Sequence, residues 1–369
     1  MAAKGKKKRR TNDRVTLGDI AKHCEVSKAT VSRVLNDRLH EFPVTEKMIQ
    51  RVKSAAEELD YRPNRLARAI RSQRTHLIGL SDFHLNSIME RTPDRIAYED
   101  QVKGEYISTI TNHPKFKDYD LVIHCRDEST DQPLKPSDFK HDLLDGMVYL
   151  NPSDNHTEFL DVASKNFPIV VVGHVAAAEE KVPCVDFNNR ETGKRAVEHL
   201  IEIGRRNILI LIPERLKHLA CLQDRLQGYH DALTQNGIQV SDKFIHHVCC
   251  TKDGIAAFFR NLPCLGEVDA IMSTTDDLAA FCIEPLTSMG YRIPEDIALI
   301  GFDNSPICQH TSPTLSSVNL IPDKQVYAAI DLLLKILNKE VPYEPGFHEI
   351  ETELVIREST VATRSDSGK

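Results

Sequence analysis

Residues 15–36 read VTLGDIAKHCEVSKATVSRVLN, and this stretch carries the start signals of two short helices. Thr16 followed by Asp19 is the pattern of a capping box, which predicts that a helix begins there. Ser27 predicts the start of a second helix, because its hydroxyl can accept a backbone N–H near Thr30. Only a tight turn fits between the two. This arrangement is typical of a helix-turn-helix, whose second helix enters the major groove of DNA.

A third helix is predicted from Thr45, and the three helices have enough apolar positions for a small core. The apolar residues at helical spacing are Leu17, Ile20 and Ala21, then Val31, Val34 and Leu35, then Ile49, Val52, Ala56 and Leu59. The second helix keeps an outer face of Lys28, Ala29, Ser32 and Arg33. An ordinary helical hairpin has the same periodicity, so the pattern alone leaves both interpretations open.

Charge is divided unevenly along the chain, which has 369 residues and a formal net charge of −7. Residues 1–75 contain 19 lysines and arginines against 9 aspartates and glutamates, a net charge of +10. The remainder contains 28 against 45, a net charge of −17. A basic module on an acidic body is expected of a protein that touches phosphates with one end. A basic leader that serves only solubility is the alternative for residues 1–10.

Other function classes lack their usual signals in this sequence. No apolar run approaches the roughly 18 residues of a membrane span, and the basic amino terminus has no apolar secretion segment. No membrane partner is therefore expected, and a cytoplasmic location is predicted. The nine cysteines form no CxxC pair, which indicates reduced thiols, and the 16 histidines show no metal spacing. Nucleotide-binding, hydrolase and zinc-protease motifs are missing, so no enzyme activity, cofactor or metal is predicted.

From Leu77 onward, short apolar runs alternate with helical stretches. The predicted strands are Leu77–Leu80, Leu121–His124, Met147–Leu150, Ile169–Val172, Ile208–Ile212, Ala270–Ser273 and Ile297–Phe302. The predicted helices are His156–Asn166, Glu191–Ile203, Leu222–Gln235, Leu278–Met289 and Lys324–Leu337. This alternation predicts an α/β fold with two doubly wound parallel sheets, and a ligand of such a fold binds at the carboxyl ends of the strands.

A longer set of amino-terminal residues matches a known pattern. The set comprises Ile20-Ala21, Val26-Ser27, the run from Ala29 to Asn36 and the run from Tyr61 to Ala67. These residues closely resemble the lactose/galactose repressor (LacI/GalR) family of bacterial transcription regulators. The resemblance implies an all-α helix-turn-helix domain, a hinge helix and a two-lobed core like that of periplasmic binding proteins. It favours the helix-turn-helix over a plain hairpin.

The resemblance also implies roles for single residues of the DNA module. Lys28, Ala29 and Arg33 match the family's base-reading positions. Arg33 is the best candidate for a bidentate contact to guanine, which contributes about 1–3 kcal/mol of discrimination. The remaining predicted contacts to DNA are caps and phosphate contacts, namely Thr16, Ser27, Thr30, Ser32 and Asn36.

A short helix-forming segment, residues 65–71, follows Pro63. In isolation it is below the roughly 12–15 residues that a stable helix needs in water. The resemblance implies that it folds on operator DNA, where two copies pack in the minor groove. The predicted contacts are Asn64, Arg65, Ala67 and Ile70, and Ile70 takes the position of the family's apolar wedge. Without the resemblance, a flexible linker is the simpler interpretation.

The acidic body resembles the core of the same family more loosely, through Glu198-His199-Leu200, Arg225 with Gly228-Tyr229, Thr275-Asp276 and Gly301-Phe302-Asp303-Asn304. In the family, the positions of Arg225 and Asp303 clamp a small polar effector, often a sugar, and a charged fork opposite an acceptor suits a polyhydroxyl ligand. Asn188 and Thr275 stand where the family prefers Asp and Asn, which predicts an effector other than a common hexose. Asp276 is predicted either to join this site or to cap the following helix.

Three stretches depart from the family pattern. Glu25 stands in the turn where the family usually has Gly, which predicts a strained or differently shaped turn. The loop of residues 37–43 is longer than usual. Residues 81–105 differ strongly, and we expect a surface loop there in preference to a reshaped pocket edge.

The predicted organisation has four parts: a disordered basic leader over residues 1–14, a helix-turn-helix domain over 15–62, a hinge helix and linker over 63–75, and an effector-binding and dimerisation core over 76–369. The first lobe of the core is predicted to take residues 76–203 and 318–347, and the second 204–317 and 348–362. A homodimer is expected, because pseudo-palindromic operator DNA presents two half-sites. The predicted function is a sequence-specific transcription repressor controlled by a small-molecule effector, a sugar or sugar derivative bound in the cleft between the lobes. A solute-binding protein for transport is the alternative, which the basic module disfavours.

Overall fold

A computed structural model of the chain describes residues 15–35, 44–61, 69, 74–82, 104–124, 143–150, 158–164, 166–173, 176–217 and 219–361. Contacts divide the chain into two units, residues 1–75 and 76–369. The predictions for the leader, the 37–43 loop, most of the hinge and most of the 81–105 stretch lie outside the described residues.

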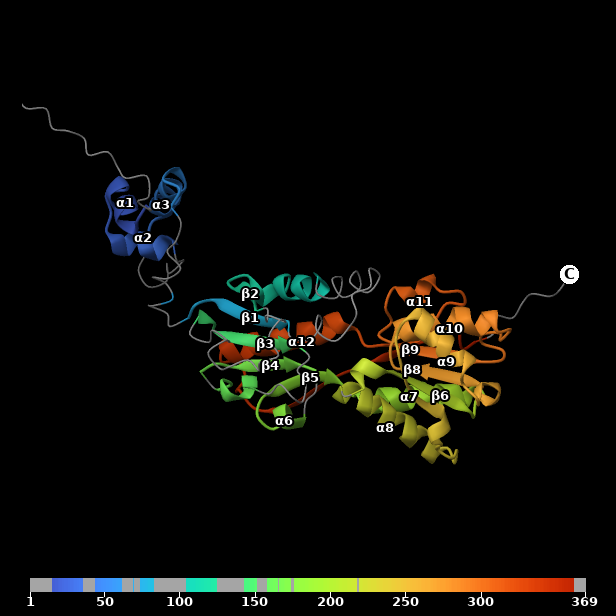
Figure 1. The fold of residues 1–369 in the computed structure, drawn as a ribbon. Helices are drawn as coiled ribbons and strands as arrows, with labels where there is room; N and C mark the ends of the chain where they lie inside the picture. The colour runs from blue at the N-terminus through green and yellow to red at the C-terminus, as the bar shows by residue number, and fades with distance from the viewer. Residues whose placement is uncertain are drawn as a thin grey trace, which may run out of the picture. The chain divides into compact units, whose positions relative to one another are not determined.

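Three helices form the described part of the first unit (Figure 1): α1 Leu17–His23, α2 Lys28–Leu35 and α3 Glu46–Glu58. Both predicted helix starts are confirmed. A carboxylate oxygen of Asp19 accepts the backbone N–H of Thr16 at 2.9 Å and its hydroxyl at 2.8 Å. The hydroxyl of Ser27 accepts the N–H of Thr30 at 3.0 Å. The buried core of this unit consists of Ile20, Ala21, Cys24, Val31, Val34, Val52, Ala55 and Ala56.

Glu25 is the residue at which the chain leaves α1 and turns toward α2. Its φ is 49°, in the left-handed region, and its side chain is exposed. The backbone N–H of the next residue, Val26, donates to the carbonyl of Ala21 at 2.9 Å, which closes the end of the helix. A residue with a Cβ costs about 1–2 kcal/mol in this conformation, so the turn is strained.

Glu25→Gly is expected to stabilise the first unit by about 1 kcal/mol, because glycine adopts this φ without the steric cost of a Cβ. The measurement is hydrogen–deuterium exchange of peptides that cover α1 and α2, which should slow severalfold. Lys22→Gly is the matched control, since Lys22 is exposed inside α1 and glycine there should speed the exchange. Faster exchange in Glu25→Gly would contradict the strain.

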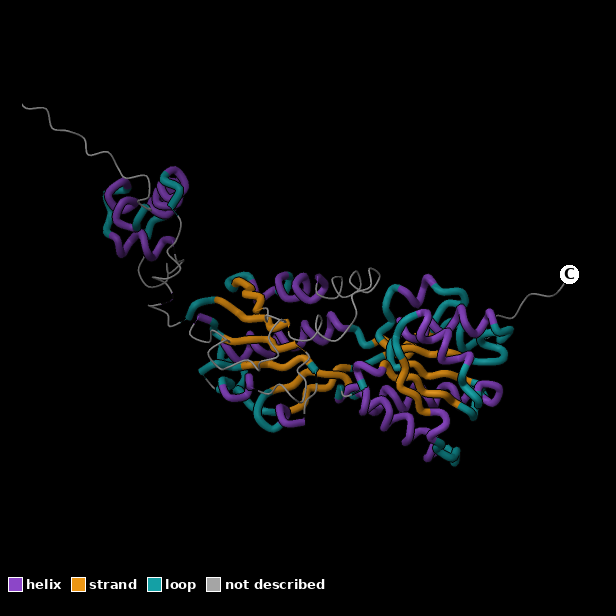
Figure 2. Tube along the Cα trace, in the orientation of Figure 1, coloured by secondary structure: helices purple, strands orange, loops and turns teal. Residues whose placement is uncertain are grey.

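Two six-stranded sheets form the second unit (Figures 1 and 2). The first sheet has the order β11-β5-β4-β3-β1-β2, with β1 Leu77–Asp82, β2 Asp120–His124, β3 Gly146–Leu150, β4 Ile169–Val172, β5 Pro183–Phe187 and β11 Gly346–Ile350. The second has the order β12-β10-β9-β8-β6-β7, with β6 Ile208–Pro213, β7 Ile245–Val248, β8 Ala270–Ser273, β9 Ala298–Phe302, β10 Ser316–Asn319 and β12 Glu353–Val355. Among these described strands, β10 and β12 pair antiparallel and the other neighbours pair parallel.

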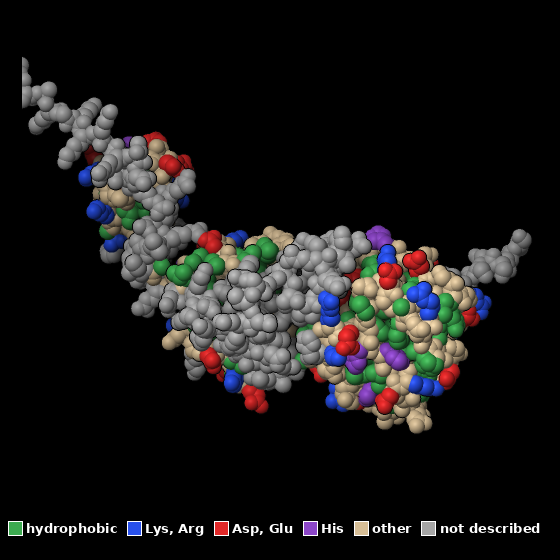
Figure 3. Space-filling model, in the orientation of Figure 1, with side chains coloured by type: hydrophobic (Ala, Val, Ile, Leu, Met, Phe, Trp, Pro, Cys, Tyr) green, Lys and Arg blue, Asp and Glu red, His purple; other side chains and the backbone are tan. Residues whose placement is uncertain are grey.

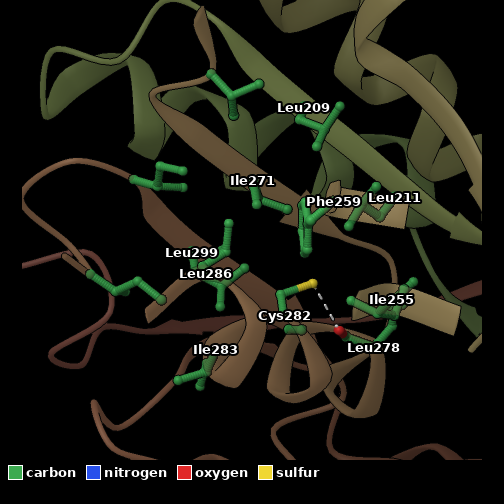
Figure 4. Close-up of a cluster of buried hydrophobic side chains, with 14 of the residues drawn as sticks. Leu209, Leu211, Ile255, Phe259, Ile271, Leu278, Cys282, Ile283, Leu286 and Leu299 are labelled. Carbon is green, nitrogen blue, oxygen red and sulfur yellow. Dashed lines mark hydrogen bonds between the residues drawn. The ribbon is translucent and has the colours of Figure 1, made fainter. Parts of the chain in front are cut away.

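Helices cover both faces of the second sheet, because successive residues of its central strands point to opposite sides. The helices of this unit whose bounds are described in full are α6 Ala176–Glu179, α7 Asn189–Glu202, α8 Ala220–Gln235, α9 Lys252–Arg260, α10 Asp276–Ser288, α11 Ile307–His310 and α12 Pro322–Leu337. Residues 104–111 are also helical. Ile208 and Ile210 pack among residues of α7 and α8, whereas Leu209 and Leu211 pack among residues of α9 and α10. Figure 4 shows the second of these clusters, in which Ile255 and Phe259 of α9 and Leu278, Cys282 and Leu286 of α10 surround the strand residues.

The first sheet is layered in the same way. Ile78, Val148 and Val170 face the side covered by α12, and Met147 and Ile169 face the opposite side. Its central strands β3 and β4 are buried along their whole length. The predicted doubly wound α/β fold is therefore confirmed. We call this sheet with α6 and α12 the first lobe, and the second sheet with α7 to α11 the second lobe.

The predicted helix over His156–Asn166 is wrong. A single 3-10 turn, η5 Glu158–Asp161, occupies the described part of this segment, and Ser164 then pairs with Phe167 in an isolated β-bridge. The hydroxyl of Ser164 accepts the N–H of Phe167 at 3.1 Å, which diverts the backbone from helix. Phe159 is fully buried and stacks on Tyr149 with ring centroids 4.3 Å apart, so its apolar character reflects insertion into the core.

The chain crosses between the lobes at other positions than predicted. Helix α7, which the prediction placed in the first lobe up to residue 203, packs in the core of the second lobe through Ala196, Val197 and Leu200. The crossing therefore lies near residue 188. β10 belongs wholly to the second sheet and β11 wholly to the first, so the predicted boundaries at 318 and 348 each cut through a strand.

Surface charge is mixed on the part of the second lobe that Figure 3 shows. Acidic and basic side chains are interspersed there, so on that face the acidic excess of the body is not gathered into one patch. Within the described residues, no helix is long and apolar enough to cross a membrane.

Candidate DNA-binding surface and effector site

The candidate DNA-binding surface is the outer face of α2. Lys28 and Ala29 are exposed and Arg33 is partly exposed, whereas Val31 and Val34 point into the core of the unit. Residues four apart in a helix lie on the same face, so Ala29 and Arg33 are neighbours on this surface. The packing of the module therefore leaves the three predicted base-reading side chains on the side away from the core.

Three of the hydroxyls predicted as caps or phosphate contacts form hydrogen bonds at the amino ends of the helices, namely those of Thr16, Ser27 and Thr30. Ser27 and Thr30 hydroxyls lie 2.8 Å apart, and Thr16 donates to Asp19. These contacts place the amino ends of α1 and α2, whose free N–H groups favour anions such as phosphate. Ser32 is partly exposed. The other predicted DNA contacts lie outside the described residues, namely Asn36, Asn64, Arg65, Ala67 and Ile70.

Arg225 is the centre of the candidate effector site in the second lobe. It lies on α8 with only 5% of its surface exposed. Its Nε donates to Oδ1 of Asn189 at 3.1 Å and its Nη1 donates to the carbonyl oxygen of Thr274 at 2.7 Å. Its Cζ lies 4.6 Å from the centroid of the Phe302 ring, a cation–π arrangement that holds the guanidinium plane. Thr274 follows β8 and Phe302 ends β9, so Arg225 lies at the carboxyl ends of the strands.

Two glycines bring the helices of this site into backbone contact. A Cβ on Gly193 of α7 would lie 2.5 Å from the carbonyl oxygen of Arg225, and a Cβ on Gly228 of α8 would clash with the carbonyl oxygen of Arg190. Only glycine permits such a close crossing. The crossing carries Asn189, the first residue of α7, within hydrogen-bond distance of Arg225.

Asp303 follows β9 and supplies the acidic group of the candidate site. Its φ is 103°, and its backbone N–H donates to the carbonyl of Val318 at 2.9 Å. Its side chain is partly buried, and no hydrogen bond within the described residues uses its carboxylate. Burial raises the pKa of Asp303, the nearby Arg225 opposes that shift, and the charges of Asp276 and Asp277 add to it. The side chain is thus an acceptor that lacks full solvation, and it follows Phe302, whose ring contacts the Arg225 guanidinium.

Asp276 holds the loop that presents Asp303. Only 1% of its surface is exposed, its two carboxylate oxygens accept the N–H of Ser305 at 2.7 Å and the hydroxyl of Ser317 at 2.6 Å, and burial raises its pKa. A Cβ on Gly301 would clash with this carboxylate. Asp276 begins α10, but its side chain is turned to the loop. Asp276 therefore stabilises the loop that carries Asp303.

Asn188 and Thr275 lie at helix starts. The Oδ1 of Asn188 accepts the N–H of Glu191 at 3.1 Å and its Nδ2 donates to Glu349 at 3.4 Å. Asn188 also lines a pocket of about 240 Å³ beside the link from β11 to β12, together with Thr192, Arg195 and residues 349–352. Thr275 is the N-cap residue of α10 and is partly exposed. Neither side chain hydrogen-bonds to Arg225 or Asp303 within the described residues.

Asn189 and Phe302 contact Arg225 directly, and neither was predicted as a site residue from the sequence. Asn189 follows the predicted site residue Asn188, and Phe302 precedes the predicted site residue Asp303. Their positions next to Asn188 and Asp303 were the available signal in the sequence. Such a position does not tell which of two neighbouring side chains faces α8.

Comparison with known proteins covers both units. The family model described as bacterial regulatory proteins, lacI family, matches residues 16–64, and the periplasmic binding protein-like domain matches residues 197–360. The chain is 30% identical over 349 residues to the probable HTH-type transcriptional repressor ExuR of Bacillus subtilis (strain 168), covering 94% of this chain and 98% of ExuR. It is 29% identical over 348 residues to the NTD biosynthesis operon regulator NtdR of the same organism, covering 94% and 99%.

Solved structures show the same fold over nearly the whole chain. The transcriptional regulator CelR in complex with cellobiose matches with a TM-score of 0.63 at 25% identity, covering 94% of this chain and 100% of that one. The lac repressor dimer bound to operator and the anti-inducer ONPF matches with a TM-score of 0.73 at 21% identity, covering 95% and 100%. From the module with its capped helices, the two-lobed core and these matches, we conclude that the chain belongs to the lacI family of bacterial regulatory proteins.

Proposed function

We propose that this protein is a transcription repressor that binds pseudo-palindromic operator DNA as a homodimer and responds to a small sugar or sugar derivative. The observation that carries the effector part is the partly buried side chain of Asp303, to which no hydrogen bond from the described residues is made, directly after Phe302, whose ring lies 4.6 Å from Cζ of Arg225. The relatives support the rest, since ExuR is named a probable repressor, the lac repressor structure is a dimer on its operator, and CelR binds cellobiose.

The pair suits a polyhydroxyl ligand for a chemical reason. A sugar hydroxyl can donate to the Asp303 carboxylate while a neighbouring hydroxyl or ring oxygen accepts from the Arg225 guanidinium. Within the described residues the hydrogen bonds of that guanidinium use Nε and Nη1, so Nη2 is the donor that we assign to the effector. Charge-assisted bonds of this kind are strong and directional. Effector binding between the lobes changes operator affinity when the ligand prefers one of two lobe arrangements.

The effector part is tested on the full-length protein with cellobiose, glucose, glucuronate and glucosamine as probes. Isothermal calorimetry measures binding, and electrophoretic mobility shift measures whether the same sugar changes operator affinity. We expect at least one probe to do both. If none of the four binds at millimolar concentration, the proposed effector class is wrong.

Arg33→Ala is expected to relax base preference at one position in each half-site of the operator. The lost guanidinium removes a bidentate base contact, which is worth about 1–3 kcal/mol of discrimination. The measurement is selection of bound DNA from random pools, first with the unaltered protein, which should select a pseudo-palindrome, and then with the variant.

Lys53→Ala is the matched control for that selection, because Lys53 is an exposed cation on α3, outside the α2 face. It should return the unaltered motif. An unaltered motif from Arg33→Ala as well would show that another residue reads the base.

A further inference from the structure

Four buried polar side chains form a continuous chain from the first lobe to Arg225. Gln325, in the first turns of α12, donates from Nε2 to Oδ1 of Asp186 on β5 at 2.8 Å. Asn189 donates from Nδ2 to Oδ2 of the same carboxylate at 3.2 Å. Arg225 then donates from Nε to Oδ1 of Asn189 at 3.1 Å. Each of the four side chains is at most 5% exposed, so water does not compete freely for these bonds.

The direction of each hydrogen bond in this chain is set by Asp186 together with two backbone carbonyls. Nδ2 of Asn189 also donates to the carbonyl oxygen of Phe187 at 3.3 Å, and Nε2 of Gln325 also donates to that of Val185 at 3.1 Å. An ionised carboxylate only accepts, whereas an amide side chain has one donor end and one acceptor end. Asn189 must therefore turn its amide nitrogen toward Asp186, and this leaves its oxygen for Arg225. The Nε of arginine only donates, so the reverse amide orientation would oppose acceptor to acceptor at Asp186 and donor to donor at Arg225. The backbone N–H of Phe187 adds a bond of 2.8 Å to Asp186 and fixes the carboxylate itself.

This series of hydrogen bonds also spans residues 186–189, the segment where the polypeptide passes from the first lobe to the second. Asp186 lies in the first sheet and Asn189 begins α7, which packs in the second lobe. The Nη1 of Arg225 donates to the carbonyl oxygen of Thr274, which follows β8 of the second sheet. Buried polar networks that are fully satisfied hold their members in one arrangement.

We propose that Asp186 is a positioning residue for the effector site. Through Asn189 it holds the guanidinium of Arg225 in the orientation that meets the effector, so that a residue of the first lobe controls half of the binding site in the second. This inference rests on the proposed function for the role of Arg225, but the positioning itself is measurable without any effector.

The first measurement is the NMR signal of the Arg225 Nε–H group in effector-free, full-length protein with labelled arginine. The signal is assigned by its loss in Arg225→Lys. In Asp186→Asn the introduced amide confronts the amide donors of Asn189 and Gln325, so we expect the Arg225 Nε–H to lose its hydrogen-bonded shift and exchange faster with solvent. An unchanged signal would overturn the proposal.

The reciprocal double variant, Asp186→Asn with Asn189→Asp, tests whether the bond pattern or mere packing matters. It reverses the donor and acceptor roles between the two positions and still offers an acceptor to Arg225, so it should restore the hydrogen-bonded signal. Failure to restore it would also overturn the proposal. Asp231→Asn is the control, because Asp231 pairs with Arg190 on the outside of the same two helices at 2.6 Å. It should leave the Arg225 signal unchanged.

The second measurement is the affinity for whichever of cellobiose, glucose, glucuronate and glucosamine binds the unaltered protein. Asp186→Asn should weaken it at least tenfold, and the double variant should recover it. An unaltered affinity in Asp186→Asn contradicts the proposal. If no probe binds the unaltered protein, the proposed effector class fails, while the NMR result still decides the role of Asp186.

Discussion

Gly228→Ala is expected to lower the free energy of unfolding of the second unit by about 3 kcal/mol, the upper part of the usual range for overpacking. The added Cβ would clash with the carbonyl oxygen of Arg190 and would lie 2.6 Å from the backbone nitrogen of Lys194. Both neighbours are backbone atoms of α7, so no side-chain rotation relieves the contact. The helices must separate, and the separation also moves Arg225 away from Asn189.

Urea unfolding followed by circular dichroism measures this loss. Gly266→Ala is the control, because an added Cβ at Gly266, in the same lobe, would meet no atom within 4 Å, and it should leave the midpoint nearly unchanged. Equal midpoints for both variants would mean that the α7–α8 crossing tolerates a larger separation than the structure indicates.

Asp303→Asn is expected to weaken effector binding by about 10- to 100-fold. The substitution keeps the size of the side chain, and asparagine tolerates the positive φ of 103° better than most residues do. What changes is one acceptor oxygen, which becomes an amide nitrogen, and a ligand hydroxyl left without its acceptor in a buried site costs about 1–3 kcal/mol. The loss should therefore be one of binding and not of folding.

Calorimetric titration with the probe that binds the unaltered protein measures this effect, and thermal unfolding of the same samples checks the fold. Glu284→Gln, an exposed charge change on α10, is the matched control and should bind normally. Normal binding by Asp303→Asn would remove Asp303 from the effector site.

Much of the fold was predictable because it depends on residues close together in the chain. The capped starts at Thr16 and Ser27 follow from side chains three positions apart. The predicted strands Ile169–Val172 and Ala270–Ser273 match β4 and β8 residue for residue, since fully buried strands are continuous apolar runs. β5 was missed because Asp186 interrupts its run. That carboxylate is tolerated inside because Gln325, far along the chain, donates to it.

The sequence by itself therefore determined the three helices of the amino-terminal module, two of their starts and the α/β alternation, and its resemblance to a family indicated the DNA-binding role and the strained turn. Caps and turns depend on neighbouring residues, so they can be predicted without knowledge of the packing. Only the tertiary structure decided that Asn189 and not Asn188 meets Arg225, that Asp276 supports the loop of Asp303, and that α7 belongs to the second lobe. Those outcomes depend on a helix crossing between Gly193 and Gly228 and on bonds between distant segments, which no local pattern encodes.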